Sequence, residues 1–577
     1  MKIKNFWNSH KGKLFLILLL ILIIPTFYSL IRPGYFPMQD DLQAFRINQM
    51  NKCFDDGQFP CRWVPDAGYQ YGYPLFNFYA PSVFYLGAIL HSVGFQIIDS
   101  VKIIFILGFI LAPFFMYLFL NSFLKNSWAA LAGSVLYAFS PIRAQEVYVR
   151  GSISEFCALI FFPLLFWSSL QLIRFGKNKY LLYLSLSLGL LMLTHNLLSL
   201  LFLPILILWI LFILSLEKKW HESGKVFLGL ILGVSLAAFF LLPVFFEKQY
   251  VHSETLLGGY FDYRQHFVDL YQLFISNHFG YGSSVFGPGD DLNLSVGQLQ
   301  WVTAVLALIL AVLFYRKNRK LTAMSLFIAA LLAPILFLMH QRSSFIWQFF
   351  PMLAYLQFPW RFLAFSSFLL PILAAIGIYL SGNIEFKKLN SAGVLTVLII
   401  ILVLSFYANF FQPRDWINLD DKTKFSGGSW NKQLTISIFD YLPIYASLPP
   451  NHQAPELPEV LDGKVTFINY RKGSNYQKGL VNVEQTATVR LPLFDFPGMA
   501  VYVDNNKVLH HHSDCRYEDF CLGLITFKID TGQHLINAVL EDTLVRTIGN
   551  IISLFGGFVF ILILIKNFGI LQRIKWS

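Results

Sequence analysis

Long apolar runs separated by short polar segments dominate the first 410 residues, and one more run lies near the C-terminus. A helix that crosses a bilayer needs roughly 20 apolar residues. The first run, LFLILLLILIIPTFYSLI, is too long for the apolar core of a signal peptide and lacks an A-x-A cleavage site, so we expect a retained helix. The pattern predicts about twelve spans. They are expected at 14–31, 100–121, 128–141, 156–173, 181–194, 197–215, 226–246, 296–315, 321–339, 361–380, 392–410 and 547–565.

One apolar stretch, LFNFYAPSVFYLGAILHSVGF at 75–95, is left out of this count. Counting it as a span would reverse the side on which every later segment lies, and would place the basic run RKNRK at 316–320 outside. Its proline, aromatic residues and modest length suit a helix that lies on the outer surface or re-enters it. A protein with thirteen spans is the alternative.

The pattern changes at 411–546, where apolar and polar residues alternate in KVTFINY, ATVRLPLF and MAVYVD. Alternation with a period of two is typical of half-buried strands, and DNN at 504–506 and DTG at 530–532 are turn signals. We therefore predict a β-sandwich domain between two spans. A stabilising lid or spacer is favoured over a carbohydrate-binding module, because no sugar-binding motif is visible.

Composition and charge place this chain among polytopic membrane proteins. It is 56% hydrophobic and 13% charged, with a mean hydropathy of +0.56. Segments between the predicted spans that would face the cytoplasm hold 20 Lys and Arg but 3 acidic residues when both termini lie inside, as the positive-inside rule requires. The net charge of +11 thus reflects membrane orientation rather than nucleic-acid binding. The outer face then receives 32–99, 142–155, 247–295, 340–360 and the β domain, and 547–577 forms the last span and a basic cytoplasmic tail.

Several charged residues gather at the predicted outer boundary. Placing a carboxylate within the membrane costs free energy unless it is paired or hydrated. Carboxylates at the ends of the predicted spans therefore favour a functional cavity there. Sugar transfer from a lipid phosphate needs a carboxylate to accept a proton and cations to hold the phosphate. The candidates are Asp40 and Asp41 as the base, Arg361, Arg150 and His195 for the phosphate, and Glu146 and Glu155 as supporting acids.

Each candidate also has a purely structural interpretation. Asp40 and Asp41 precede the apolar-periodic LQAFRINQM and could cap a helix. His195 could cap a helix end, and Arg361 in QFPWRFL could be an interfacial anchor. The charged residues of EVYVRGSISE could form ordinary ion pairs in a solvated loop.

The loop 247–295 combines aromatic residues with glycine-rich backbone in GGYFDYRQHF and NHFGYGSSVFGPGDD. This composition suits a sugar ring, although it also fits any mobile external loop. Candidate contacts to a sugar or an acceptor are Tyr263, Arg264, His278 and Tyr281. Nucleotide-binding and protease motifs are not found in a convincing context, so soluble chemistry of those kinds has no support.

Four of the five cysteines form two local pairs on the predicted outer side. Disulfides Cys53–Cys61 and Cys515–Cys521 are expected if the exterior is oxidising, and all four could otherwise be free thiols. The stretch HHHSDC at 510–515 offers metal ligands, but consecutive side chains on a strand point to opposite faces. A shared zinc site there is disfavoured.

The order of these features resembles the GT-C superfamily of membrane glycosyltransferases, which use polyprenyl-phosphate sugars. More narrowly, several stretches are similar to bacterial membrane proteins of the YfhO type and to those described as membrane 6-pyruvoyl-tetrahydropterin synthase-related. The stretches that carry this resemblance are QDDLQAFRI, CRWVPDAGYQYGYPLFNFYAP, YVRGSISEFCA, LQFPWRFL, FPGMAVYVDNNKV and GQHLINAVLEDTLVR. The superfamily likeness is mainly architectural.

The resemblance implies a GT-C-like membrane domain at 1–410 and a catalytic aspartate in the first outer loop, here Asp40 or Asp41. The expected function is inverting transfer of a sugar from a polyprenyl phosphate to a cell-envelope glycan acceptor at the outer face. No cofactor is certain, and a divalent metal is left open. The pattern often has a histidine before the acidic pair, and Gln39 at this position weakens the case for a base relay or a metal there. A lipid-linked-sugar flippase or a noncatalytic envelope-assembly protein are the alternatives; the nearly charge-free span centres disfavour a flippase.

Overall fold

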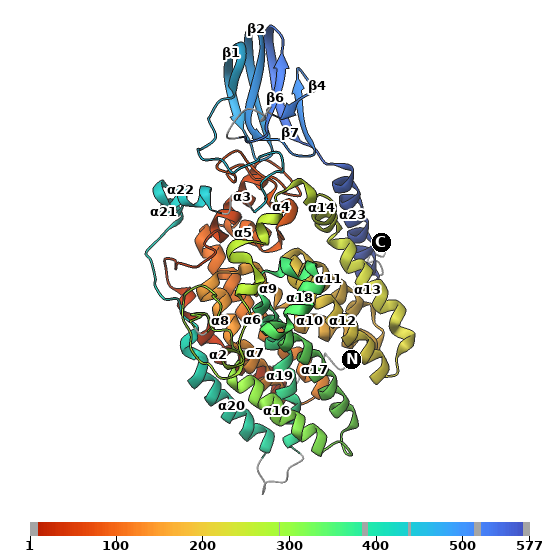
Figure 1. The fold of residues 1–577 in the computed structure, drawn as a ribbon. Helices are drawn as coiled ribbons and strands as arrows, with labels where there is room; N and C mark the ends of the chain where they lie inside the picture. Colours follow the sequence, from red (N-terminus) through yellow and green to blue (C-terminus); the bar gives the residue numbers. More distant parts are fainter. Residues whose placement is uncertain (1–9, 288, 383–389, 437–439, 513–520, 569–577) are drawn as a thin grey trace.

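The computed structural model describes residues 10–287, 289–382, 390–436, 440–512 and 521–568. A large helical body carries a β domain at one end, and the last helix, α23, returns from the β domain along one side of the body (Figure 1). Between the two parts, the described residues of 411–458 form short helices and irregular backbone, and the strands begin at Glu459. The β domain is therefore shorter than the 411–546 predicted from the alternating pattern.

All twelve apolar segments that were predicted to span the membrane are helical, some of them as broken helices. The elements are α2 (His10–Leu22), α6 (Ile97–Leu124), α7 (Ser127–Ala138), α10 (Phe161–Phe175), α11 (Asn178–Thr194), α12 (Asn196–Leu216), α13 (Ser223–Leu236) with α14 (Ala238–Phe246), α16 (Gln298–Leu313), α17 (Arg319–Met339), α19 (Leu363–Ser381), α20 (Ser391–Tyr407) and α23 (Leu544–Phe568).

The predicted number of full-length spans is wrong. Among the described residues, seven helices are long and apolar enough to cross a membrane, or eight if α13 and α14, bent by 71°, form one span. Helix α7 shows why hydropathy overcounts: it has 12 residues, nearly all of them buried among neighbouring helices. A short helix surrounded by protein is as apolar as one surrounded by lipid, and only length separates the two.

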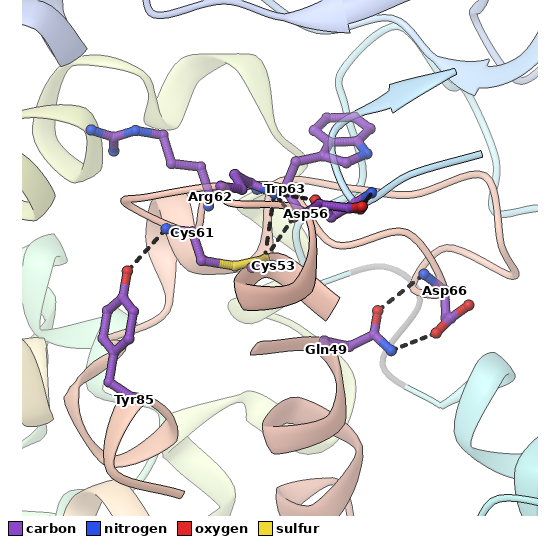
Figure 2. Close-up of a disulfide and its surroundings, with 10 residues drawn as sticks. Gln49, Cys53, Asp56, Cys61, Arg62, Trp63, Asp66 and Tyr85 are labelled. Carbon is purple, nitrogen blue, oxygen red and sulfur yellow. Dashed lines mark hydrogen bonds between the residues drawn. A yellow bond between two sulfur atoms is a disulfide. The ribbon is translucent and has the colours of Figure 1, made fainter. Parts of the chain in front are cut away.

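The stretch 75–95, left out of the span count, forms two short helices, α4 (Leu75–Phe78) and α5 (Ser82–Ser92). Neither is long enough to cross a bilayer. They belong to a folded first outer loop that also contains α3 (Gln43–Asp55). Figure 2 shows how the loop is fixed: a disulfide joins Cys53 to Cys61, and Gln49 exchanges two hydrogen bonds with Asp66.

Segments assigned to the cytoplasm meet at one end of the helical body. Arg174, in the last turn of α10, binds Glu217, after α12, at 2.8 Å and donates to the carbonyl of Ser122 in α6. Lys320 at the start of α17 lies 3.9 Å from the same carboxylate. Segments assigned to the outer face gather at the other end with the β domain, as Asn196 shows by donating to the carbonyl of Phe78. The structure thus separates the two sets, and the charge bias remains the argument for which end faces the cytoplasm.

The β domain is one antiparallel sheet, a half-barrel, rather than the two packed layers of the predicted β-sandwich. All seven described strands belong to this sheet, in the order β4-β3-β7-β2-β6-β5, with β1 also paired to β2. The strands are β1 (Glu459–Lys472), β2 (Tyr476–Phe494), β3 (Met499–Val503), β4 (Asn506–Val508), β5 (His511–His512), β6 (Leu524–Ile529) and β7 (Gly532–Leu540).

Only one of the two predicted turns reverses the chain. Asp504 and Asn505, both at positive φ, join β3 to β4 as a tight hairpin. The second turn signal, DTG, lies between β6 and β7, which both run antiparallel to β2 and pair with successive parts of it. Ile529 pairs with Ala487, and Gly532 pairs with Val483. The chain therefore runs on from β6 to β7 along the same edge of β2, with an irregularity between the two strands.

A buried ion pair fixes the β domain and α23 to the helical body. Arg546, in the first turn of α23, binds the carboxylate of Glu247 at 2.9 Å and also donates to the carbonyl of Pro497 before β3. Asn77 of the first outer loop donates to the same carboxylate at 2.8 Å. Arg546 is 0% and Glu247 2% exposed, so both charges depend on these partners.

Candidate functional site

Asp40 and Asp41 lie in the turn that precedes α3, but they do not cap this helix. The N-cap position is Leu42, without a side-chain cap. The turn instead lies against the chain near Arg150: the amide of Asp40 donates to the carbonyl of Arg150, and the amide of Gln39 to that of Val149, both at 2.9 Å. The structure therefore brings the acidic pair next to the second predicted acidic segment, more than 100 residues away.

The approach of these two segments depends on a glycine. Glu146–Arg150 is a single turn of π-helix, and Gly151 ends it at φ +70. Met38 packs so closely against Gly151 that a β-carbon there would overlap its side chain. Gln43 then donates to the carbonyl of Gly151 at 2.8 Å. An insertion of this kind within a helix is rare and is frequently found at functional sites.

The carboxylate of Asp40 is held by side chains of α3. Arg46 binds its Oδ2 at 2.9 Å, and the amide nitrogen of Gln43 donates to the same oxygen at 2.9 Å. The guanidinium of Arg46 also lies over the ring of Tyr79, 4.5 Å from its centre. Arg46 is buried, whereas the side chain of Asp40 is 36% exposed. Asp40 is thus an oriented carboxylate that solvent can still reach.

Asp41 has a different partner, from the segment that leads to the β domain. Lys424, whose side chain is 4% exposed, binds Oδ2 of Asp41 at 2.6 Å. The other oxygen, Oδ1, is buried and has no hydrogen-bond partner in the described part of the chain. Burial raises the pKa of Asp41 even though Lys424 opposes this shift.

Four predicted residues form a buried cluster beside this turn. Nη1 of Arg150 lies 2.5 Å from Oε1 of Glu146 and 2.9 Å from Oε2 of Glu155. Nε of Arg361 lies 3.6 Å from that same oxygen of Glu155. All four side chains are 10% exposed or less. Glu146, Arg150 and Glu155 are therefore not ion pairs of a solvated loop, and Arg361 is not an exposed interfacial anchor. The cluster joins residues that are up to 215 positions apart.

The electrostatics of this cluster depend on Glu146. Two arginines and two glutamates balance each other when all are ionised. Burial raises the pKa of Glu146 well above its usual range, and Glu155 raises it further, although Arg150 opposes both effects. Oε2 of Glu146 is buried without a partner among the described residues. A protonated Glu146 would leave a net charge of +1, which favours an incoming anion.

His195 lies beside the buried cluster, where it interacts electrostatically with Glu155, Arg361 and Arg150, whereas Tyr263 and Arg264 of loop 247–295 have other partners. Nδ1 of His195 accepts a hydrogen bond from the amide of Leu198, so this residue caps α12, as its structural interpretation predicted. Tyr263 stacks on Trp347 with ring centres 5.0 Å apart, and exposed Arg264 binds neighbouring Asp262. No contact joins either of these two residues to the acidic turn in the described structure.

The second half of that loop does reach the acidic turn. Gln39 donates to the carbonyl of Gly282 at 2.8 Å. Next to it, the hydroxyl of Tyr281 donates to the carbonyl of Gln412 at 2.9 Å. His278 binds Asp291 at 2.9 Å, and Asp291 also accepts hydrogen bonds from the amides of Tyr281 and Gly282. His278 and Tyr281 therefore lie on a segment that borders Asp40.

The two aspartates are each paired with a cation of this chain. Asp40 binds Arg46 through Oδ2, and Asp41 binds Lys424 through Oδ2. Within the described residues, no group of three or more His, Cys, Asp or Glu side chains is arranged to hold a metal ion. In the stretch HHHSDC, His510 and His512 both contact Asp495, while 513–515 lie outside the described residues.

The cysteine pairs can be followed in part. Cys53 and Cys61 are joined by a disulfide, as Figure 2 shows. Cys521 is also disulfide-bonded, and its predicted partner Cys515 lies outside the described residues. Figure 2 further shows that Arg62 and Trp63, directly after this loop, point to different neighbours. Arg62 donates to the carbonyl of Phe239 in α14, whereas Trp63 packs on Phe496 beside the β domain.

Sequence reasoning missed the direct partners of both aspartates. Arg46 could have been found, because it follows Asp40 by six residues at the start of a predicted helix. Lys424 could not, since 383 positions separate it from Asp41 and nothing in the segment around it indicates a site. Trp360 was also missed: its ring lies under the guanidinium of Arg150, 4.5 Å from its centre, and its indole nitrogen donates to Ser284.

Comparisons with known structures give a distant likeness. The oligosaccharyltransferase of Archaeoglobus fulgidus in its apo form is similar with a TM-score of 0.41 and 12% identity, over 70% of this chain and 56% of that one. The same enzyme in complex with Zn and sulfate gives a TM-score of 0.39 and 14% identity, over 70% and 54%. TM-scores below 0.5 do not establish a shared fold.

Sequence comparisons are more specific. An uncharacterized protein of Lactococcus lactis subsp. cremoris (strain MG1363) is 27% identical over 259 residues, which make up 42% of this chain and 41% of the relative. The chain thus matches less than half of that relative's length. A family model described as "6-pyruvoyl-tetrahydropterin synthase related domain; membrane protein" matches residues 76–411.

The family match covers the buried cluster of Glu146, Arg150, Glu155 and Arg361, but neither the aspartate pair nor the β domain. It agrees with the multi-pass architecture and confirms the resemblance to membrane proteins related to 6-pyruvoyl-tetrahydropterin synthase, whereas the likeness to YfhO-type proteins stays a prediction. Because the match extends over more than half of the chain, this protein belongs to the 6-pyruvoyl-tetrahydropterin synthase related family of membrane proteins.

Proposed function

We propose that this protein is an inverting glycosyltransferase that moves a sugar from a polyprenyl phosphate to a cell-envelope glycan at the outer membrane face. The observation that supports this most strongly is the meeting of Asp40 with the Arg150 and Arg361 cluster. Asp40 bonds through its amide to Arg150, and Arg150 shares Glu155 with Arg361. A base and two cations from three distant parts of the chain are the groups that this reaction needs.

The reaction requires one carboxylate. The base accepts the proton of an acceptor hydroxyl, and the hydroxyl oxygen forms a bond to the anomeric carbon on the face opposite the phosphate. The bond from that carbon to the phosphate oxygen breaks, and its electron pair leaves with the phosphate. One displacement inverts the anomeric configuration, so a second carboxylate nucleophile is not needed.

Asp40 is the better candidate for the base. Arg46 and Gln43 fix one oxygen of Asp40, while the side chain stays 36% exposed and open to an acceptor. Asp41 instead bonds to Lys424 and anchors the segment that leads to the β domain. We assign catalysis to Asp40 and positioning to Asp41.

Arg150 and Arg361 are the groups proposed to bind the phosphate. A guanidinium offers paired donors that match phosphate oxygens. Arg361 is incompletely hydrogen-bonded, because its buried Nε has no hydrogen-bond partner in the described structure and contacts Glu155 only at 3.6 Å. With Glu146 protonated, the cluster carries the positive charge that stabilises a departing phosphate.

Replacement of the two aspartates tests the proposal in cells. The chromosomal gene is removed and replaced by wild type, Asp40→Asn or Asp41→Asn, and the cell-surface glycan is analysed. Loss of a general base lowers the rate by ~100-fold or more. We expect Asp40→Asn to remove the glycan modification at unchanged protein level, and Asp41→Asn to reduce it less. Unchanged glycan in both single variants and in the double variant would refute the proposal.

A further inference from the structure

A large cavity lies among α5, α6, α10 and α11, away from the aspartate turn. Its volume is about 2290 Å³, and none of the predicted catalytic or phosphate-binding residues lines it. Drug-sized ligands occupy pockets of roughly 300 to 1,000 Å³, so this space is at least twice as large. Its middle is apolar, with Leu107, Leu111 and Phe114 of α6 facing Leu164 of α10 and Leu190 of α11.

One end of the cavity is strongly basic. The lining there includes Lys125 after α6, Arg174 at the end of α10, Lys177 and Lys179 at the start of α11, and the basic run 316–320 where α17 begins. A single carboxylate, Glu217, belongs to this lining, and it pairs with Arg174 at 2.8 Å and with Lys320 at 3.9 Å. The remaining cations form no ion pair within the described part of the chain. Such a concentration of one sign of charge attracts an anion.

An unpaired donor supports this interpretation. Asn318 also lines the basic end, and its Nδ2 is buried without a hydrogen-bond partner among the described residues. Buried polar groups are normally hydrogen-bonded. A phosphate oxygen at this end would supply the missing acceptor.

The dimensions of the cavity fit a lipid environment. Along α6 its lining runs from Ile104 to Lys125, and at 1.5 Å per residue this is about 30 Å, the thickness of the hydrocarbon layer. The rim carries exposed apolar side chains, among them Leu86, Phe175 and Leu186. A molecule in the bilayer can therefore enter from the side without crossing a polar surface.

We propose that this cavity binds a bilayer phospholipid with an anionic headgroup. The phosphate lies at the basic end beside Asn318, and the acyl chains extend between α6, α10 and α11. This end collects the segments assigned to the cytoplasm, where anionic lipids attract juxtamembrane cations. The inference does not rest on the proposed sugar transfer, because Asp40 and Arg361 belong to the opposite end of the helical body.

Native mass spectrometry tests the proposal. The full-length protein is delipidated in detergent, reloaded with phosphatidylglycerol, phosphatidylcholine or undecaprenyl phosphate, and the retained lipid is measured. The charge variants K177Q/K179Q and R316Q/R319Q remove cations without an ion pair. The matched control K478Q/K528Q removes two exposed cations of the β domain. A third variant, L111W/L164W, fills the apolar part.

We expect wild type and the control to retain phosphatidylglycerol over phosphatidylcholine by on the order of tenfold, and each charge variant to lose this preference. The variant L111W/L164W should retain less of both phospholipids. Equal retention of the two phospholipids by wild type, or an equal loss in the control, would overturn the proposal. Undecaprenyl phosphate bound at Arg150 and Arg361 should be retained equally by wild type and both charge variants. A preference for undecaprenyl phosphate over phosphatidylglycerol that both charge variants lose would overturn the proposal too, because the occupant of this cavity would then be a prenyl lipid.

Discussion

Asp40 and Asp41 are neighbours in the chain but differ in environment. Asp40 binds Arg46 on the following helix, whereas Asp41 binds Lys424 from a distant segment. The position of both depends on close contact between Met38 and Gly151. At the scale of single residues, the site is therefore held by one backbone position where only glycine fits.

Replacing Gly151 by alanine tests this dependence, and Gly57 provides a matched control. Both glycines have nearly equal positive φ, +70 and +69, but a β-carbon at Gly57 meets nothing within 4 Å. Gly57→Ala should cost about 1 to 2 kcal/mol for the backbone conformation alone. Gly151→Ala should cost clearly more, because it also displaces Met38. Thermal unfolding of the purified variants measures both, and equal shifts would show that the Met38 contact is unimportant.

At the scale of elements, buried ion pairs connect helices to loops and to the β domain. Arg546 of α23 reaches Glu247 after α14, and Asn77 of the first outer loop reaches the same carboxylate. The β domain is thereby fixed to the helical body at the end that holds Asp40. The described strands form a single sheet at this end, and a role as a lid or spacer stays a prediction.

Arg546→Met should destabilise the protein strongly. Removing one partner of a buried pair leaves an uncompensated charge and typically costs about 3 to 5 kcal/mol. The control is Lys464→Met, which breaks an exposed pair with Glu484 on the β domain and should cost less than about 1 kcal/mol. Chemical denaturation followed by tryptophan fluorescence compares the two. A small effect of Arg546→Met would mean that α23 is not held by this pair.

Hydropathy and charge predicted much of the architecture. Every apolar run became a helix, and segments assigned to opposite faces lie at opposite ends. Span length could not be predicted, since buried α7 is as apolar as a lipid-facing helix. The alternating pattern predicted strands, but it could not show that β6 and β7 pair one after the other with the same strand, β2. The arginine and glutamate cluster was foreseen as a set of residues, whereas the pairing of Lys424 with Asp41 depends on tertiary folding alone.

At the scale of the whole molecule, the basic end and the β-domain end are opposite poles. The positive-inside rule places the basic pole in the cytoplasm. Cysteine labelling measures this, because Cys157 is buried and Cys53, Cys61 and Cys521 are disulfide-bonded.

Lys478→Cys on the β domain should react with a membrane-impermeant maleimide in intact cells. Lys317→Cys at the basic pole should react only after the cells are permeabilised. The parent protein without either substitution gives the background. The reverse pattern would place Asp40 in the cytoplasm and remove the basis for transfer at the outer face.

Release of polyprenyl phosphate by the purified protein tests the central claim most directly. Wild type and Asp40→Asn are reconstituted in liposomes with polyprenyl-phosphate-linked glucose or N-acetylglucosamine and a cell-envelope glycan fraction. We expect wild type to release polyprenyl phosphate and form a product of inverted anomeric configuration, and Asp40→Asn to lose at least ~100-fold in rate while it stays folded. Equal release by the two proteins, or a product of retained configuration, would contradict the assignment of Asp40 as the base.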